Sequence, residues 1–202
     1  NATGYGVFLQ ARSSYGYFVR NVVVNNTTIR DCSLDGLRIT MEPNSENVTV
    51  GNSTFSGNRQ HGAYFETRGL LLLDDNVFSG NGFGGGVDGY YGLRVVGDNV
   101  GGFVLSGGNR FVGNRNGVYL RRVGSGSGPV VLSGSQLTDN AGYPVVVDGV
   151  AFVTVRDAVF DDAAARLATG FGVQRGVLIR GASSNVTVSG VTVNRTSQQG
   201  LF

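Results

Sequence analysis

Apolar residues recur along the chain in the same order seven times. Each unit has a period-two apolar pair, a short Gly, Asn or Asp turn, one large apolar residue, a polar turn, and then Gly (Pro144 in one unit) followed by two apolar residues around a variable position. The large apolar residues are Ile29, Phe55, Phe78, Phe111, Leu137, Phe160 and Val193. They are separated by 26, 23, 33, 26, 23 and 33 residues. Spacing of this kind predicts a repeat architecture.

The apolar segments within each unit are short. Each spans three or four residues with period two, which predicts strands, and no stretch keeps helical spacing over several turns. The first strand of each unit carries the pairs Val22/Val24, Val48/Val50, Leu71/Leu73, Phe103/Leu105, Val130/Leu132, Val153/Val155 and Val186/Val188. Three short strands separated by turn residues predict one coil of a parallel β-helix, whereas a propeller blade needs four strands. Each strand would then pair with its equivalent in the next coil, about 4.8 Å away.

With this order of elements, and with segments such as NVTVGNSTFSGN and NVTVSGVTVNRT, the chain resembles the right-handed parallel β-helix repeat family, the pectate-lyase-like superfamily in the broad sense. The resemblance covers nearly all 202 residues and implies an all-β, right-handed parallel β-helix solenoid of about seven coils of three short strands. That fold serves lyases, hydrolases, epimerases, tailspikes, adhesins and non-catalytic surface proteins, so the fold alone does not determine activity.

The first and last units are incomplete. A free solenoid end exposes apolar surface and unpaired strand edges, so solenoids normally carry capping elements. We therefore expect residues 1–202 to form a single β-helix segment of a longer chain that lacks its caps here.

Composition limits the range of partners. The net charge of +2 gives no strong electrostatic attraction to nucleic acid, and no apolar run is long enough to insert into a membrane. Apolar residues make up 41% of the chain, enough for a continuous core. Cys32 is the only cysteine, so no disulfide can form within the segment, and we expect a small buried residue there.

Asparagine occurs in two patterns. Asn58, Asn81, Asn114 and Asn140 each lie three residues after a large apolar residue, which predicts a column of stacked amides. Seven asparagines begin Asn-x-Ser/Thr sequons: Asn1, Asn25, Asn26, Asn47, Asn52, Asn185 and Asn194. Two explanations stay open. In the first, the sequons arise without a function, because Asn suits β-helix turns and Thr suits the strands that follow. In the second, they are N-glycosylation sites of an extracellular or cell-surface protein.

The resemblance implies that a substrate would lie across the sheet built from the Gly-apolar-x-apolar strands. The outward positions of those strands are Phe8, Arg38, Tyr64, Arg94, Tyr119, Val146, Leu178 and Phe202. Of these, Arg38, Tyr64, Arg94 and Tyr119 should form an alternating cationic and aromatic row. Aromatic faces pack on sugar rings and Arg pairs with uronate or sulfate groups, so we regard the four as candidate ligand-binding residues. The alternative is cross-strand stacking that only protects an exposed sheet.

Two coils carry insertions just before these strands, at residues 82–91 and 163–175. Both contain Gly-Phe-Gly, and loops beside such a sheet often determine specificity. The pair could frame a cleft over Tyr119, Arg121, Arg122 and Tyr143, although surface insertions are also tolerated without a function.

The catalytic candidates are few. The residues just before the candidate sheet are Asp35, His61, Tyr91, Asn116, Tyr143 and Arg175. Asp35 and His61 would be neighbours on successive coils and are the only acid/base candidates that we identify. They would serve a lyase or epimerase acting on acidic glycans, and only that reaction would call for Ca²⁺. We otherwise expect no metal and no cofactor. Asp74-Asp75 and Asp161-Asp162 fall at expected turns.

The sequence thus favours a non-catalytic structural or glycan-binding β-helix segment of a secreted or cell-surface glycoprotein. Its partners would be a polysaccharide or glycan, further coils of the same chain, or other copies joined end to end. The alternatives are a polysaccharide lyase or epimerase acting on acidic glycans, and an adhesin or tailspike rod.

Overall fold

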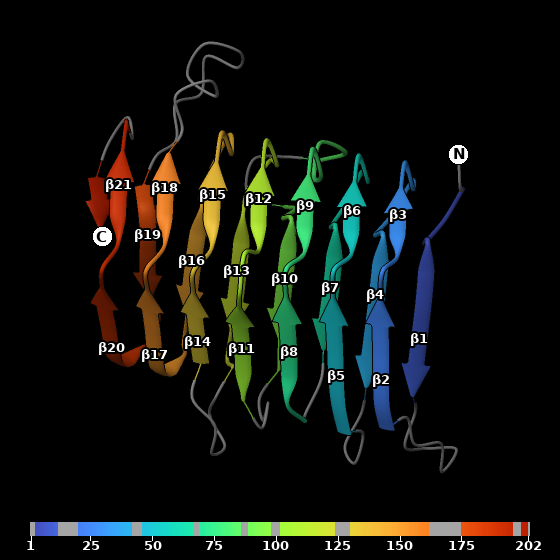
Figure 1. Cartoon of the computed structure of the whole chain (residues 1–202), viewed down its shortest axis with the longest axis horizontal. Helices are drawn as coiled ribbons and strands as arrows, with labels where there is room; N and C mark the ends of the chain where they lie inside the picture. Colours follow the sequence, from blue (N-terminus) through green and yellow to red (C-terminus); the bar gives the residue numbers. More distant parts are fainter. Residues whose placement is uncertain are drawn as a thin grey trace.

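In the computed structural model the chain forms a parallel β-solenoid whose coils stack along its long axis (Figure 1). The structure describes residues 3–11, 20–41, 46–66, 69–85, 89–97, 102–123, 130–161, 175–195 and 199–201. These residues form three parallel sheets of eight, seven and seven strands, here called sheets A, B and C. Among them, no helix is long and apolar enough to cross a membrane.

The strands of each sheet follow one another at regular intervals along the chain. Sheet A contains β1 (Val7–Ala11), β4 (Leu37–Met41), β7 (Ala63–Glu66), β10 (Leu93–Val96), β13 (Val118–Arg121), β16 (Val145–Asp148), β19 (Arg175–Arg180) and β22 (Gln199–Leu201). Sheet B contains β2 (Arg20–Asn25), β5 (Glu46–Gly51), β8 (Leu71–Asp74), β11 (Phe103–Ser106), β14 (Val130–Ser133), β17 (Ala151–Arg156) and β20 (Ser184–Ser189). Sheet C contains β3 (Thr28–Arg30), β6 (Thr54–Ser56), β9 (Val77–Ser79), β12 (Arg110–Val112), β15 (Gln136–Thr138), β18 (Val159–Asp161) and β21 (Thr192–Asn194).

Each coil runs through sheet B, then sheet C, then sheet A. Figure 1 shows sheets B and C on the near side of the molecule and sheet A behind them. The register confirms the predicted alignment of the units: Val22 pairs with Val48, Val48 with Leu71, and Leu71 with Phe103. The coil containing residues 82–91 keeps this register, because Tyr64 pairs with Arg94 directly across it.

The inward residues of the three sheets fill a single continuous core. Phe55, Phe78 and Phe111 are fully buried and stack on one another, with ring centroids 5.1 and 4.7 Å apart. Burying a side chain of this size contributes roughly 1.5–3 kcal/mol. Cys32 belongs to the same core at 2% exposure, as expected, and burial raises the pKa of its thiol.

The Gly, Asn and Asp turns owe their composition to backbone conformation. The residue after each sheet B strand has a positive φ, from 47° at Asn52 to 65° at Gly107. A second column of positive φ follows the sheet C strands and includes Asp31, Gly57 and Asp139. Only Gly, and to a lesser degree Asn and Asp, adopts this conformation without a steric cost. The predicted turn at Asp74-Asp75 is confirmed, since Asp75 has φ 51°.

The predicted column of asparagine amides is present and buried. Asn81 Nδ2 donates to Asn114 Oδ1 at 2.9 Å and to the Phe55 carbonyl at 2.9 Å. Its Oδ1 accepts from the backbone N–H and the Nδ2 of Asn58, at 3.0 and 2.9 Å. Asn140 continues the column, accepting from Asn114 Nδ2 at 3.1 Å. These bonds join successive coils at the corner between sheets C and A.

A second amide column, which was not predicted from the sequence, joins the coils between sheets B and C. Asn76 Oδ1 accepts from the Ser53 N–H at 3.0 Å, and Asn109 Oδ1 accepts from the Asn76 N–H at 2.9 Å. Each of these residues immediately precedes a sheet C strand. Asparagine at this shared position was the signal in the sequence. Ser53 made it harder to recognise, because one coil has serine there instead.

Candidate functional site

The outer face of sheet A carries the predicted row of side chains. The register aligns Phe8, Arg38, Tyr64, Arg94, Tyr119, Val146 and Leu178 across seven successive strands. Phe202, the last expected member, lies outside the described residues. The predicted row is therefore confirmed over its described length.

Arginine and tyrosine side chains stack on one another along this row. The Arg38 guanidinium carbon lies 4.2 Å from the centroid of the Tyr64 ring. Arg94 lies between two rings, 5.9 Å from the Tyr64 centroid and 5.1 Å from that of Tyr119. At the other end, Arg38 also lies 5.6 Å from the Tyr5 centroid. Each contact of this kind contributes roughly 0.5–1 kcal/mol at an exposed site.

The two arginines differ in their anionic partners. Arg38 Nη1 lies 3.0 Å from Asp35 Oδ2, an ion pair in which the carboxylate is fully buried. Among the described residues no carboxylate forms an ion pair with Arg94. The buried Nε of Arg94 has no hydrogen-bond partner there either. Arg94 is partly exposed. Its charge is therefore held between aromatic faces without being neutralised by a neighbouring acid.

Tyr119 belongs to the row but, contrary to expectation, is not exposed. Its side chain points outward from the sheet but is only 6% exposed. It packs in a second apolar cluster, outside the coil, with Tyr91, Val146 and Leu178. Its ring centroid is 5.0 Å from that of Tyr91, and its hydroxyl donates to Asp148 Oδ2 at 2.9 Å. The accessible part of the row consists of Phe8, Arg38, Tyr64 and Arg94.

Asp35 and His61 lie on successive coils, as predicted, but both make structural contacts. Asp35 Oδ1 accepts from the His61 backbone N–H at 2.9 Å, while Oδ2 binds Arg38. His61 Nδ1 accepts from the backbone N–H of Tyr91 at 3.0 Å. Two coils later Asn116 Oδ1 does the same for the Tyr143 N–H at 2.9 Å. Side chains at this corner serve as hydrogen-bond acceptors between coils.

The surroundings of His61 favour its neutral form. The imidazole is 4% exposed and contacts the rings of Tyr64, Tyr90 and Tyr91, with centroids 5.8, 5.3 and 6.2 Å away. Burial, together with the charges of Arg94 and Arg38, lowers the pKa of His61 to about 3. Since Nδ1 accepts a hydrogen bond, the proton of the neutral ring is on Nε2.

For two acidic groups at this site, burial has the opposite effect and raises the pKa. The Asp35 carboxyl has a raised pKa because it is buried, although its hydrogen bonds to the His61 N–H and to Arg38 oppose this effect. The Tyr64 hydroxyl has a raised pKa because of its burial and the nearby Glu66 carboxylate. Asp35 thus has both carboxylate oxygens in hydrogen bonds, and His61 is closely packed with Nδ1 accepting a hydrogen bond.

Three further residues of this face were not predicted from the sequence. Tyr5 stacks on Phe8 with centroids 5.0 Å apart. Arg180 Nε lies 3.1 Å from Asp148 Oδ2, and the Arg180 guanidinium lies 5.9 Å from the Tyr119 centroid. Asp148 and Arg180 each lie two positions after an outward residue of sheet A. The period of two along a strand could therefore have placed them.

The expected cleft between the two insertions is described only in part. Arg121 and Arg122 are exposed and Tyr143 is half-buried, but residues 86–88 and 162–174 lie outside the described residues. Nor do the described residues group three or more His, Cys, Asp or Glu side chains that could hold a metal ion. The confirmed features of the site are thus the Arg/Tyr row and the acceptors at its edge.

Comparison with known proteins agrees with this architecture. A family model described as "Right handed beta helix region" matches residues 11–100 and 39–202. No curated protein and no solved structure matches the chain. The family match covers most of the chain and is consistent with the three parallel sheets of the structure. The chain belongs to the right-handed β-helix family.

Proposed function

We propose that this β-helix is a rigid, non-catalytic rod of a secreted or cell-surface protein, and that it binds acidic glycans on the outer face of sheet A. The observation that carries the proposal is Arg94, a partly exposed guanidinium between the rings of Tyr64 and Tyr119 that has no ion-pair partner among the described residues. Such a group can bind a uronate or sulfate without first breaking an internal ion pair.

The neighbouring residues fit a sugar chain better than a small isolated anion. Phe8 is 45% exposed and stacks on Tyr5, and the half-buried Tyr64 ring lies between two guanidinium groups. Aromatic faces pack on the apolar faces of sugar rings, while the arginines pair with anionic substituents. Successive strands are about 4.8 Å apart, close to the length of one sugar residue, so a glycan along the axis would meet these groups in turn.

The test is retention of the full-length protein on immobilised neutral, uronate and sulfated polysaccharides, with and without Ca²⁺, together with an assay for new chain ends. We expect retention on an acidic polysaccharide that weakens with salt, and no new chain ends. The variant Arg94→Gln should bind about tenfold more weakly, a loss of about 1.4 kcal/mol.

The matched control is Arg110→Gln, which removes the same charge from an exposed residue of sheet C. Equal binding by both variants would show that only net charge matters and would contradict the proposal. Absence of retention on every polysaccharide would also contradict it, and new chain ends would show an enzyme instead.

A further inference from the structure

The asparagines that the structure describes fall into two classes, which differ in burial. Seven are buried: Asn58, Asn76, Asn81, Asn109, Asn114, Asn116 and Asn140. None of these seven has Ser or Thr two positions later. Seven more of the described asparagines are exposed, and all of them except Asn21 begin a sequon. Among the described asparagines, the tripeptide therefore occurs only where the side chain reaches solvent.

The fold explains the exposed asparagines but not the threonines that accompany them. Asn21, Asn47 and Asn185 occupy one column at the start of the sheet B strands, with φ of 52°, 44° and 51°. Asn26 and Asn52 occupy another column just after these strands, with φ of 50° and 47°. Positive φ favours Asn at all five positions. It places no requirement on the residue two positions later.

Other coils show what the fold requires at that later position. After Asn47 and Asn185 it holds Thr49 and Thr187, which lie on the outer face of sheet B. In the middle coils the same position holds Leu72, Val104 or Val131, after Asn21 it holds Val23, and after Phe152 it holds Thr154.

Over both columns, Thr lies two positions after four of the five asparagines. It lies two positions after only two of the eight other described residues of these columns. The packing of sheets B and C therefore does not require threonine at these positions, whereas the sequon does.

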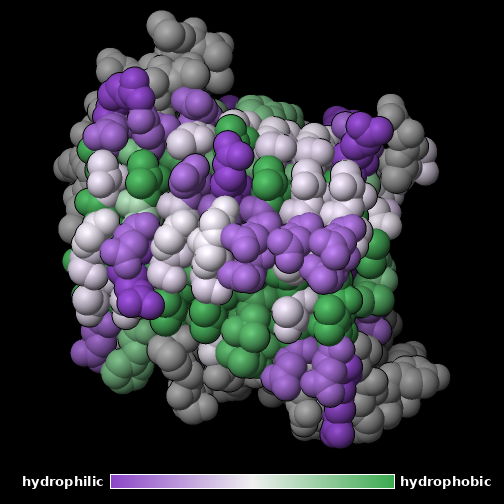
Figure 2. Space-filling view, in the orientation of Figure 1, coloured by the Kyte–Doolittle hydropathy of each residue, from purple (hydrophilic) through white to green (hydrophobic). Residues whose placement is uncertain are grey.

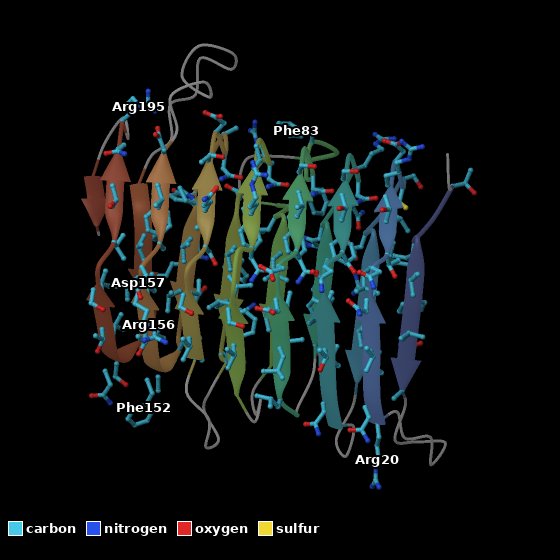
Figure 3. All side chains as sticks on the ribbon, in the orientation of Figure 1. Arg20, Phe83, Phe152, Arg156, Asp157 and Arg195 are labelled. Carbon is cyan, nitrogen blue, oxygen red and sulfur yellow. The ribbon has the colours of Figure 1, made fainter. Side chains whose placement is uncertain are left out.

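The geometry of these asparagines leaves room for a large substituent. The Nδ2 atoms of Asn47 and Asn52 make only long hydrogen bonds, to Asn21 Oδ1 at 3.4 Å and to Asn25 Oδ1 at 3.5 Å. A glycosylated amide nitrogen keeps one hydrogen, so such a contact could persist after modification. Phe152 occupies the same column as Asn185 and is labelled at the lower edge of sheet B in Figure 3. It is 61% exposed, which shows that a side chain at this edge extends into solvent.

We infer that Asn47, Asn52 and Asn185 carry N-linked glycans. In this modification the amide nitrogen forms a bond to C1 of an oligosaccharide carried on a lipid pyrophosphate. The bond between C1 and the pyrophosphate oxygen breaks, the lipid pyrophosphate leaves with the electron pair, and the amide loses one proton to a base of the transferase. The lipid-linked oligosaccharide and its transferase are the only co-reactants, and no oxidant or reductant is required.

These glycans would stand on sheet B, on the side of the rod opposite the Arg/Tyr row. Figure 2 shows the outer surfaces of sheets B and C, where apolar residues gather in the lower middle of the view, and hydrophilic residues form a band across its centre and a group at its lower right. The described sequons begin in or directly after β2, β5, β20 and β21, which belong to the first two coils and the last coil of the rod. The inference does not depend on glycan binding by sheet A, because the two sites share no residue.

The test is peptide mass spectrometry of the full-length protein isolated from its native source, with fragmentation that keeps the sugar on the asparagine. We expect sugar on Asn47, Asn52 and Asn185 and none on Asn21, the matched control with the same column, exposure and φ. Unmodified asparagine at all three sites would overturn the inference. Sugar on Asn21 would also overturn it, because modification would then not follow the tripeptide.

Two variants produced in the same source separate modification from folding. Thr49→Val should remove the glycan from Asn47 without loss of thermal stability, because Val occupies this position in β2 and β11. Val23→Thr should create a new glycan at Asn21. Failure of this gain in a folded variant, or a glycan on Asn47 that persists in Thr49→Val, would contradict the inference. Arg94→Gln leaves all of these sites unchanged, so loss of polysaccharide binding and loss of glycosylation are scored separately.

Discussion

Replacing His61 with Asn should remove a large part of the pH dependence of stability. In the folded protein the pKa of His61 is lowered from 6.5 to about 3, so the ring stays neutral while the same histidine in the unfolded chain gains a proton. The unfolded state therefore binds more protons between these two pKa values, and the free energy of unfolding falls as the pH falls from about 6.5 toward 3. Above pH 6.5 this contribution to stability is complete.

The size of the effect follows from the pKa values. Between pH 7.5 and pH 5 the histidine should lower the free energy of unfolding by about 2 kcal/mol, taking about 1.36 kcal/mol for each pH unit below 6.5. Asp35 acts with the opposite sign, since its raised pKa costs stability as the pH rises above 3.8. Asp35 is present in both proteins, so its effect cancels when the variant is compared with the parent.

Asparagine is the matched substitute because the fold already uses it at this corner. Asn116 Oδ1 accepts from the Tyr143 N–H at 2.9 Å, just as His61 Nδ1 accepts from the Tyr91 N–H at 3.0 Å. An amide at position 61 can therefore keep the hydrogen bond while removing the titratable ring. The measurement is urea unfolding of both proteins at pH 7.5 and pH 5. We expect the parent to lose about 2 kcal/mol more than the variant over this range.

A direct measurement of the pKa supplies the control. His61 is the only histidine of the 202 residues, so its ring signals in an NMR titration need no assignment. The signals should stay those of the neutral ring, protonated on Nε2, down to about pH 4. A midpoint near 6.5, or parallel loss of stability in the two proteins between pH 7.5 and pH 5, would refute the reasoning.

Three further substitutions test the contacts described above. Asn81→Ala removes four buried hydrogen bonds and should lower the free energy of unfolding by about 3 kcal/mol, measured by urea unfolding; a loss below about 1 kcal/mol would contradict the role of the amide column. Arg38→Ala and Arg94→Ala each remove two ring contacts, worth about 1 kcal/mol together, but Arg38→Ala also leaves the buried Asp35 carboxylate without its ion pair and should cost about 2 kcal/mol more than Arg94→Ala. Equal losses in these two variants would show that the ion pair is not what distinguishes them. Phe152→Asn should raise stability by about 1 kcal/mol in a thermal unfolding assay, because φ is 56° there and asparagine tolerates it, and an unchanged or lower melting temperature would contradict this account.

The fold and its register could be predicted because they depend on simple local rules. Period-two apolar pairs identify the strands, and positive φ favours Gly, Asn and Asp at the turns. The order of these features places Tyr64 next to Arg94 although an insertion separates them in the sequence. Alternation along a strand determines which face a side chain occupies, and the row on sheet A follows from that.

The exposure and the hydrogen bonds of the side chains at the site could not be predicted in the same way. Tyr119 occupies the outward face as expected, but Tyr91 precedes the neighbouring strand and covers it, so orientation did not imply exposure. Asp35 and His61 are adjacent as expected, yet both are buried and accept backbone hydrogen bonds from the next coil. These outcomes depend on three-dimensional packing between coils, which a single sequence pattern does not contain.

The insertion at residues 82–91 shows where this protein can change without refolding. It lengthens one coil to 33 residues, while the neighbouring coil has 23, and yet strands on both sides keep the same partners. Doubling the length of a loop costs only about 0.6 kcal/mol of chain entropy. The corner before sheet A can therefore accept new segments of different length and chemistry. Because it lies beside the arginine and tyrosine row, evolution or design could alter what this surface recognises while leaving the core intact.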